Sequence, residues 1–147
     1  MRSILNPTDR DNVLARLEQL RPDSKKQWGK MSIEQMLHHC NLGVKQALGE
    51  LPFEPKVTFM TRTLMKFFVF RMKWPKSSPT HPSLDVLANS SATADFKTEQ
   101  AALKANLLKF LENPDSADHP FFGNMSKEDW ARLTWKHLDH HFRQFGN

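Results

Sequence analysis

Trp135-Lys136-His137-Leu138-Asp139-His140-His141-Phe142-Arg143-Gln144 is the stretch from which both a fold class and a candidate site follow. His137 and His141 are four residues apart, so on a helix they lie one above the other. At about 100° per residue, both fall in the middle of an apolar helix face. That face also carries Trp130, Leu133, Leu138 and Phe145. The pattern predicts an amphipathic helix whose two imidazoles point into a protein core.

Apolar residues recur at helical spacing in every other long segment of the chain. Ser32 and Gln35 form a capping-box pattern, and Thr8 is the N-cap candidate of the first segment. No segment alternates as a strand would. Helices are predicted from about Asn6 to Leu20, Ser32 to Leu48, within Val57–Met72, from about Asp95 to Leu111 and from Ser126 to Phe145.

These segments predict an all-α fold, a bundle of four long helices with a short extra N-terminal helix. A long loop, a candidate lid, runs from Pro75 to Ser91 before the fourth long helix and contains His81. The aromatic residues of the third segment and its flank are predicted to be bundle core: Phe67, Phe68, Phe70 and Trp74.

Composition limits the class of protein. The chain has 147 residues, with 21 Lys and Arg against 16 Asp and Glu, a net charge of +5. This length predicts a single domain over residues 1–147. One cysteine, Cys40, allows no internal disulfide and favours a cytoplasmic protein. The most apolar stretch is too charged for membrane insertion. The aromatic residues of that stretch are expected in the core and thus unavailable to a nucleic acid, so a nucleic-acid partner is not predicted either.

A catalytic metal site usually has three protein ligands, so the histidine pair of the last helix needs a third. The doublet His38-His39 is the natural source, and His39 lies at the border of its apolar stripe whereas His38 lies further round. The sequence thus predicts a metal site of His39, His137 and His141. A hydrogen-bonded histidine core and a pair of His137 with His140 remain the alternatives.

Other side chains are candidates for supporting positions. Gln144 follows His141 by three residues and is a candidate to orient a ligand or hold a metal-bound water. His140 lies near the border of the same face, and His119 opens the loop before the last helix, where it could line a pocket. Cys40 falls inside an apolar stripe, which favours a structural thiol over a ligand or nucleophile.

Two parts of the chain resemble a known family. Trp28-Gly29-Lys30-Met31-Ser32 and Met36-Leu37-His38-His39-Cys40 resemble the opening of a DinB-like domain, as do His119-Pro120-Phe121-Phe122-Gly123 and the stretch from Trp135 to Gly146. The chain is thus similar to a DinB-like branch of unknown function over about residues 28–49 and 119–146. The resemblance implies a four-helix bundle with a divalent metal ion, zinc or nickel above all, bound by three histidines. The matching positions are His39, His137 and His141, and Gln144 matches a glutamine that follows the last ligand.

The resemblance also implies a function. DinB-like enzymes include transferases and isomerases that use bacillithiol, mycothiol or glutathione, and many are homodimers. We therefore expect a metal-dependent S-transferase that passes a low-molecular-weight thiol to an electrophilic small molecule through a metal-held thiolate, with a hydrolase as the nearest variant. The alternative is a non-catalytic metal or small-ligand binding module. Catalytic residues beyond the metal ligands are not assigned. Candidates to attract an anionic thiol, or else to form a solvated basic face, are Arg62, Lys66, Arg71 and Lys73.

Overall fold

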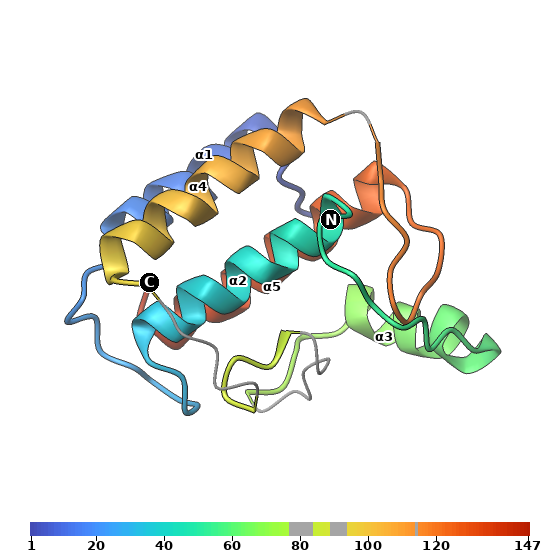
Figure 1. Cartoon of the computed structure of the whole chain (residues 1–147), viewed down its shortest axis with the longest axis horizontal. Helices are drawn as coiled ribbons and strands as arrows, with labels where there is room; N and C mark the ends of the chain where they lie inside the picture. The colour runs from blue at the N-terminus through green and yellow to red at the C-terminus, as the bar shows by residue number, and fades with distance from the viewer. Residues whose placement is uncertain (77–83, 89–93, 114) are drawn as a thin grey trace.

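The fold is helical throughout the part of the chain that the structure describes. The computed structural model describes residues 1–76, 84–88, 94–113 and 115–147 (Figure 1). Within these ranges there is no strand, only an isolated bridge between His119 and Gly123. The all-α prediction is confirmed. His81 and most of the predicted lid lie outside the described residues. The elements are α1 (Pro7–Gln19), α2 (Ile33–Ala47), the π-helical segment η1 (Thr61–Met65), α3 (Lys66–Arg71), α4 (Phe96–Glu112) and α5 (Lys127–Gln144).

Side-chain caps start the four long helices. The Ser32 hydroxyl accepts from the backbone N–H of Gln35, and the Gln35 side chain accepts from that of Ser32, so the predicted capping box is confirmed. Asp95 and Ser126 cap α4 and α5 with side-chain oxygens that accept from backbone N–H groups of the first turn. The N-cap of α1 is Asn6, not Thr8, because Pro7 occupies the first helical position, where its missing N–H costs nothing.

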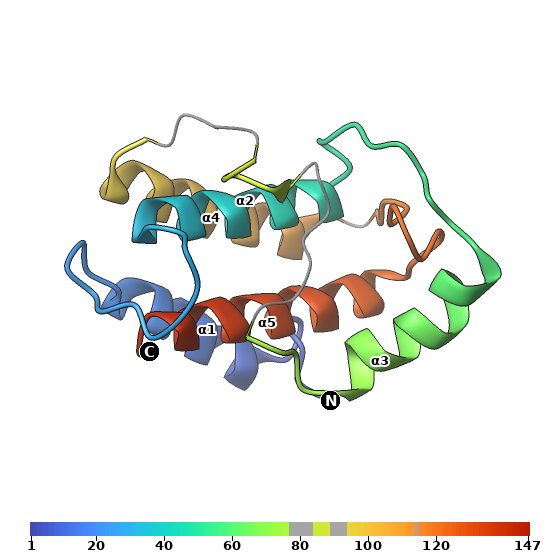
Figure 2. The same ribbon diagram turned by 90° about the horizontal axis from the view of Figure 1, so that it is seen from below.

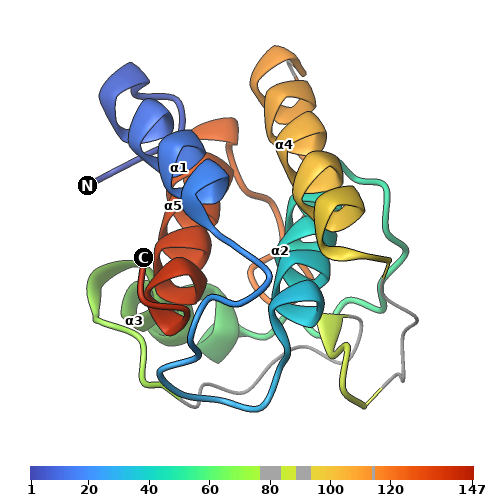
Figure 3. The same ribbon diagram turned by 90° about the vertical axis from the view of Figure 1, so that its left-hand side faces the viewer.

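The four long helices form a bundle around a common apolar core. α1 packs against α4 and α5, and α2 packs against the same two helices. Figure 3 shows α1 with α5 on one side of the bundle and α2 with α4 on the other. The contact between α2 and α5 brings together the two helices that carry the histidines. Fully buried core side chains include Leu17, Met36, Leu37, Leu103, Leu138 and Phe142.

The membership of the bundle differs from the prediction. α1 is one of its four helices, because Val13 and Leu17 are only 1% and 0% exposed. The segment predicted within Val57–Met72 is helical but lies on the flank of the bundle beside α5 (Figure 2). It is attached there by an ion pair of 2.8 Å between Lys66 and Asp129.

The apolar side chains of η1 and α3 are only partly buried. Met65, Val69 and Phe70 pack against the core, but Phe67 and Phe68 are 57% and 45% exposed. The prediction that Phe67 and Phe68 belong to the bundle core is therefore wrong. A helix on the flank of the bundle buries only one of its faces, and these two residues lie on the other. None of the described helices has the length and apolar character needed to cross a membrane.

Candidate metal centre

Three histidines from two helices meet between α2 and α5. His39 and His141 are 4% and 8% exposed, and His137 is half-buried. One ring nitrogen from each lies within 4.8 Å of the others. The ring centroids are 4.8 Å apart for His39 and His137 and 4.7 Å apart for the two other pairs. The structure thus brings together the three residues predicted as ligands.

Hydrogen bonds outside the cluster determine where two of the rings carry their protons. Nδ1 of His39 lies 2.7 Å from the carbonyl oxygen of Leu84, which can only accept, so this nitrogen donates. Nδ1 of His141 lies 2.9 Å from Oε1 of Gln144, and Nε2 of that amide donates to the Trp28 carbonyl at 2.9 Å. With Nδ1 protonated, each neutral ring keeps a lone pair on Nε2. Metal-binding histidines typically have such an outer hydrogen bond.

His137 lies against a glycine of the facing helix. Its Nε2 is 2.8 Å from Nε2 of His39. A Cβ atom on Gly43 would lie 3.0 Å from Nδ1 of His137, closer than ordinary contacts allow. Gly43 therefore lets α2 approach the His137 ring closely.

Burial keeps the three imidazoles in their neutral form. Desolvation lowers the pKa of His39 and, with the neighbouring histidines, holds that of His137 well below its ordinary value. Desolvation lowers the pKa of His141 to about 3, against a partial opposing effect of the Gln144 hydrogen bond. Neutral rings are the form that a divalent ion binds, and His39 and His141 each present the Nε2 lone pair that such an ion needs. The donor set therefore fits a metal ion.

Comparison with known proteins identifies the family. The family described as "Protein of unknown function (DUF1569)" matches residues 1–147. The chain belongs to the DUF1569 family. No curated protein and no solved structure matches it closely enough to count as a relative.

Two other histidines of this DUF1569 chain lie beside the cluster without joining it. His140 has its ring centroid 5.1 Å from that of His141 and is flanked by Trp28 and Trp74, at 5.9 and 5.8 Å. His38 turns to α4, where its Nδ1 lies 3.0 Å from Oε1 of Glu99.

His119 lies in the segment before α5, where it bridges to Gly123. Its ring stacks on Phe122 with centroids 4.1 Å apart, and its Nδ1 accepts from the backbone N–H groups of Phe121 and Phe122. These contacts hold the ring in the turn before α5 and beside Trp130, with centroids 5.2 Å apart, and the suggestion that His119 lines the pocket stays a prediction.

Four positions around the cluster escaped the sequence analysis. Leu84 contributes a backbone carbonyl, which no side-chain pattern reveals. Trp74, whose ring centroid lies 6.0 Å from that of His137, comes from the segment after α3. Gly43 and Gly29 allow close approaches; the φ of Gly29 is +81°, and a Cβ there would lie 2.3 Å from Nε2 of Gln144. Only the two glycines offered a sequence signal, since glycine often marks close contact.

Proposed function

We propose that His39, His137 and His141 together bind one divalent metal ion. The observation that carries this proposal is the convergence of three neutral imidazoles, two of which already have their Nδ1 proton bound outside the cluster. Three histidines form the ligand set of zinc enzymes that keep a further position open. Imidazole suits both zinc and nickel, so we propose one of these two ions.

We further propose that the chain is a metal-dependent enzyme of the DinB-like kind that transfers a low-molecular-weight thiol to an electrophile. The resemblance of the segments around His39 and His141 supports this, as does a ligand set of three. A divalent ion at this site supplies a Lewis acid that lowers the pKa of a thiol or water within its reach.

The protein's own groups have defined tasks in this proposal. The Leu84 carbonyl and the Gln144 amide hold the rings of His39 and His141 in fixed orientations. The Trp74 indole lies beside His137, with ring centroids 6.0 Å apart, and bounds the site on that side. These groups position the ligands before any ion or substrate arrives.

Metal content is the first test, and the His38-His39 doublet supplies a matched pair of variants. We expect untagged protein to contain about one zinc or nickel ion per chain, and added metal to raise its melting temperature. His39→Gln should abolish both effects, whereas His38→Gln should keep them, since His38 faces Glu99. Absence of metal and of any thermal shift in wild type, or equal losses in both variants, would reject the site.

Turnover is the second test. Metal-loaded protein is mixed with bacillithiol, mycothiol or glutathione and an electrophile such as an activated aryl halide, and conjugate formation is followed. We expect a rate above that of chelator-treated protein, which His141→Ala abolishes and His38→Gln preserves. Metal binding without turnover on the panel would instead support the binding module.

We also propose that the chain forms a homodimer through η1 and α3. The support is that six large apolar side chains between residues 59 and 72 are exposed, and exposed apolar surfaces commonly mark interaction sites. Light scattering after size exclusion should give twice the chain mass, and Phe59→Ser with Phe67→Ser should halve it. A monomer at high protein concentration would contradict the proposal. The exposed side chains are Phe59, Met60, Leu64, Phe67, Phe68 and Met72.

A further inference from the structure

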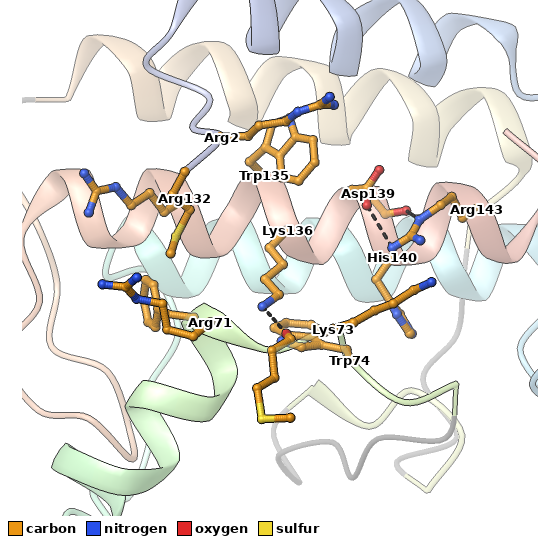
Figure 4. Close-up of a pocket in the computed structure, with 13 residues that line it drawn as sticks. Arg2, Arg71, Lys73, Trp74, Arg132, Trp135, Lys136, Asp139, His140 and Arg143 are labelled. Atoms are coloured by element: carbon orange, nitrogen blue, oxygen red, sulfur yellow. Dashed lines mark hydrogen bonds and ion pairs between the residues drawn. The ribbon is translucent and has the colours of Figure 1, made fainter.

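A cavity lies on the side of α5 that faces away from α2. Its volume is about 330 Å³, within the range of small-molecule sites. It is bounded by the N-terminal segment, by the end of α3 with the residues after it, and by the outer face of α5 (Figure 4). We call this cavity the α5 pocket.

Positive charge dominates the α5 pocket. Its one acidic lining residue, Asp139, is already bound by Arg16 at 2.8 Å and by Arg143 at 2.9 Å. Arg71 and Lys73 are exposed and form no ion pair with any described residue. Arg2, Arg132 and Arg143 are paired with Asp9, Glu128 and Asp139. An anion entering the pocket therefore meets unneutralised positive charge chiefly at Arg71 and Lys73. The cationic lining residues are Arg2, Arg71, Lys73, Arg132, Lys136 and Arg143.

Aromatic faces lie among these cations. Nζ of Lys136 is 5.7 Å from the centroid of the Trp74 ring, and the Arg2 guanidinium is 5.1 Å from that of Trp135. Figure 4 shows Lys136 pointing toward Trp74, with Arg71 and Lys73 on either side of it. Planar apolar walls beside cations suit a ligand that has a flat body and an anionic end.

The α5 pocket adjoins the candidate metal centre, but no triad histidine lines it. His137 and His141 leave α5 toward α2, whereas Lys136 and Arg143 leave it toward the pocket. Trp74 and His140 line the pocket and also flank the triad, with ring centroids 6.0 Å from that of His137 and 5.1 Å from that of His141, respectively. The proposed ligand contacts only lining residues, so its binding does not require a metal ion at the triad.

We propose that the α5 pocket binds a small organic oxyanion, a carboxylate or a phosphate ester with a planar apolar body. Arg71 or Lys73 contacts the oxyanion, since neither forms an ion pair with a described residue and the two lie on opposite sides of Lys136 (Figure 4). The indole of Trp74 packs against the body of the ligand. This inference goes beyond the proposed function and stands without it.

Calorimetric titration with four probes tests the proposal. The probes are phenyl phosphate, benzoate, inorganic phosphate and neutral benzyl alcohol, each added to chelator-treated and to metal-loaded full-length protein. We expect phenyl phosphate or benzoate to bind in both preparations with similar affinity, and the stronger of the two identifies the oxyanion. Inorganic phosphate and benzyl alcohol should bind about tenfold or more weakly, since each lacks one half of the ligand.

A double variant locates the binding. Arg71→Gln with Lys73→Gln should weaken binding of the preferred anion by about tenfold or more, because charge-assisted hydrogen bonds are lost. Both residues are exposed, so the fold survives their replacement. Lys25→Gln with Lys97→Gln removes the same charge from exposed sites outside the pocket and should leave binding unchanged.

Three results would overturn the proposal: no binding of either aromatic anion, equal binding of benzyl alcohol, or equal affinity in the two double variants. Failure of the metal proposal is recognised separately. Protein that takes up no metal but binds phenyl phosphate through Arg71 and Lys73 would refute the metal centre and retain the α5 pocket.

Discussion

Oε1 of Gln144 accepts a hydrogen bond of 2.9 Å from Nδ1 of His141. The other end of the same amide donates to the Trp28 carbonyl, and the backbone N–H of Gln27 donates to the Gln144 carbonyl at 2.7 Å. The segment before α2 therefore holds the amide that orients a ring of α5. This relay leads directly to the first prediction.

Removing the Gln144 amide should weaken metal binding without unfolding the bundle. We expect Gln144→Ala to lower zinc or nickel affinity by about 10–100-fold, the usual cost of losing an outer partner of a metal ligand. Gln144→Glu keeps an acceptor for His141 and should retain more affinity than the alanine variant. Competition titration against a chelating dye measures both, and unchanged affinity in Gln144→Ala would contradict the positioning role.

Gly43→Ala should displace the His137 ring. The added Cβ would lie 3.0 Å from Nδ1, so ring or helix must shift by a few tenths of an ångström. Alanine favours a helix interior by about 1 kcal/mol over glycine, which offsets part of this strain. We therefore expect circular dichroism to remain native while metal affinity falls. Native affinity in this variant would show that the contact relaxes freely.

Acid should destabilise the metal-free protein through the triad. Burial lowers the pKa of His141 to about 3, whereas a histidine in the unfolded chain titrates near about 6.5. Between these values the unfolded chain binds more protons, so the free energy of unfolding falls as the pH drops from about 6.5 toward about 3. Urea denaturation of chelator-treated protein at a series of pH values measures this fall. Replacing all three triad histidines by glutamine should make the free energy of unfolding depend less on pH. An unaltered pH dependence in this variant would contradict the role of the triad.

Cys40 should be inert in the native protein. It is fully buried, its thiol lies 3.7 Å from the Met36 sulfur, and desolvation raises its pKa well above the ordinary value. Because the thiolate is the reactive form, a disulfide-exchange reagent should label Cys40 only after denaturation. Labelling at the rate of a free thiol without denaturant would show that the core around α2 opens readily.

Core truncation should distinguish α1 from α3. Leu17→Ala should lower the free energy of unfolding by about 2–5 kcal/mol, because it leaves a cavity in the bundle. Phe68→Ala should cost much less, since 45% of that residue is exposed. Chemical denaturation at equilibrium measures both changes. Comparable costs would mean that α3 contributes to the core as fully as α1.

The helical spacing and the caps could be predicted from sequence because they are local. An apolar stripe with a capping residue such as Ser32 or Ser126 requires only neighbours within a few positions. The same periodicity placed His137 and His141 on one face. It also placed His39, rather than His38, nearer the apolar stripe of its helix, and the structure turns these two residues to different neighbours in that sense.

Tertiary structure alone decided which helices form the bundle and how the triad is completed. Periodicity shows that a helix has an apolar face, but not which element covers that face. For this reason the segment of η1 and α3 was expected to be one of the four bundle helices, whereas in the structure α1 is the fourth. The Leu84 carbonyl and the Gly43 contact join residues far apart in sequence, and no local pattern encodes such a meeting. The sequence determined which imidazoles face inward. Only the packing of α2 on α5 decided that His39 faces His137 and His141. The physical reason is that the apolar faces of the two helices pack together to exclude water, which brings the imidazoles they carry into one site.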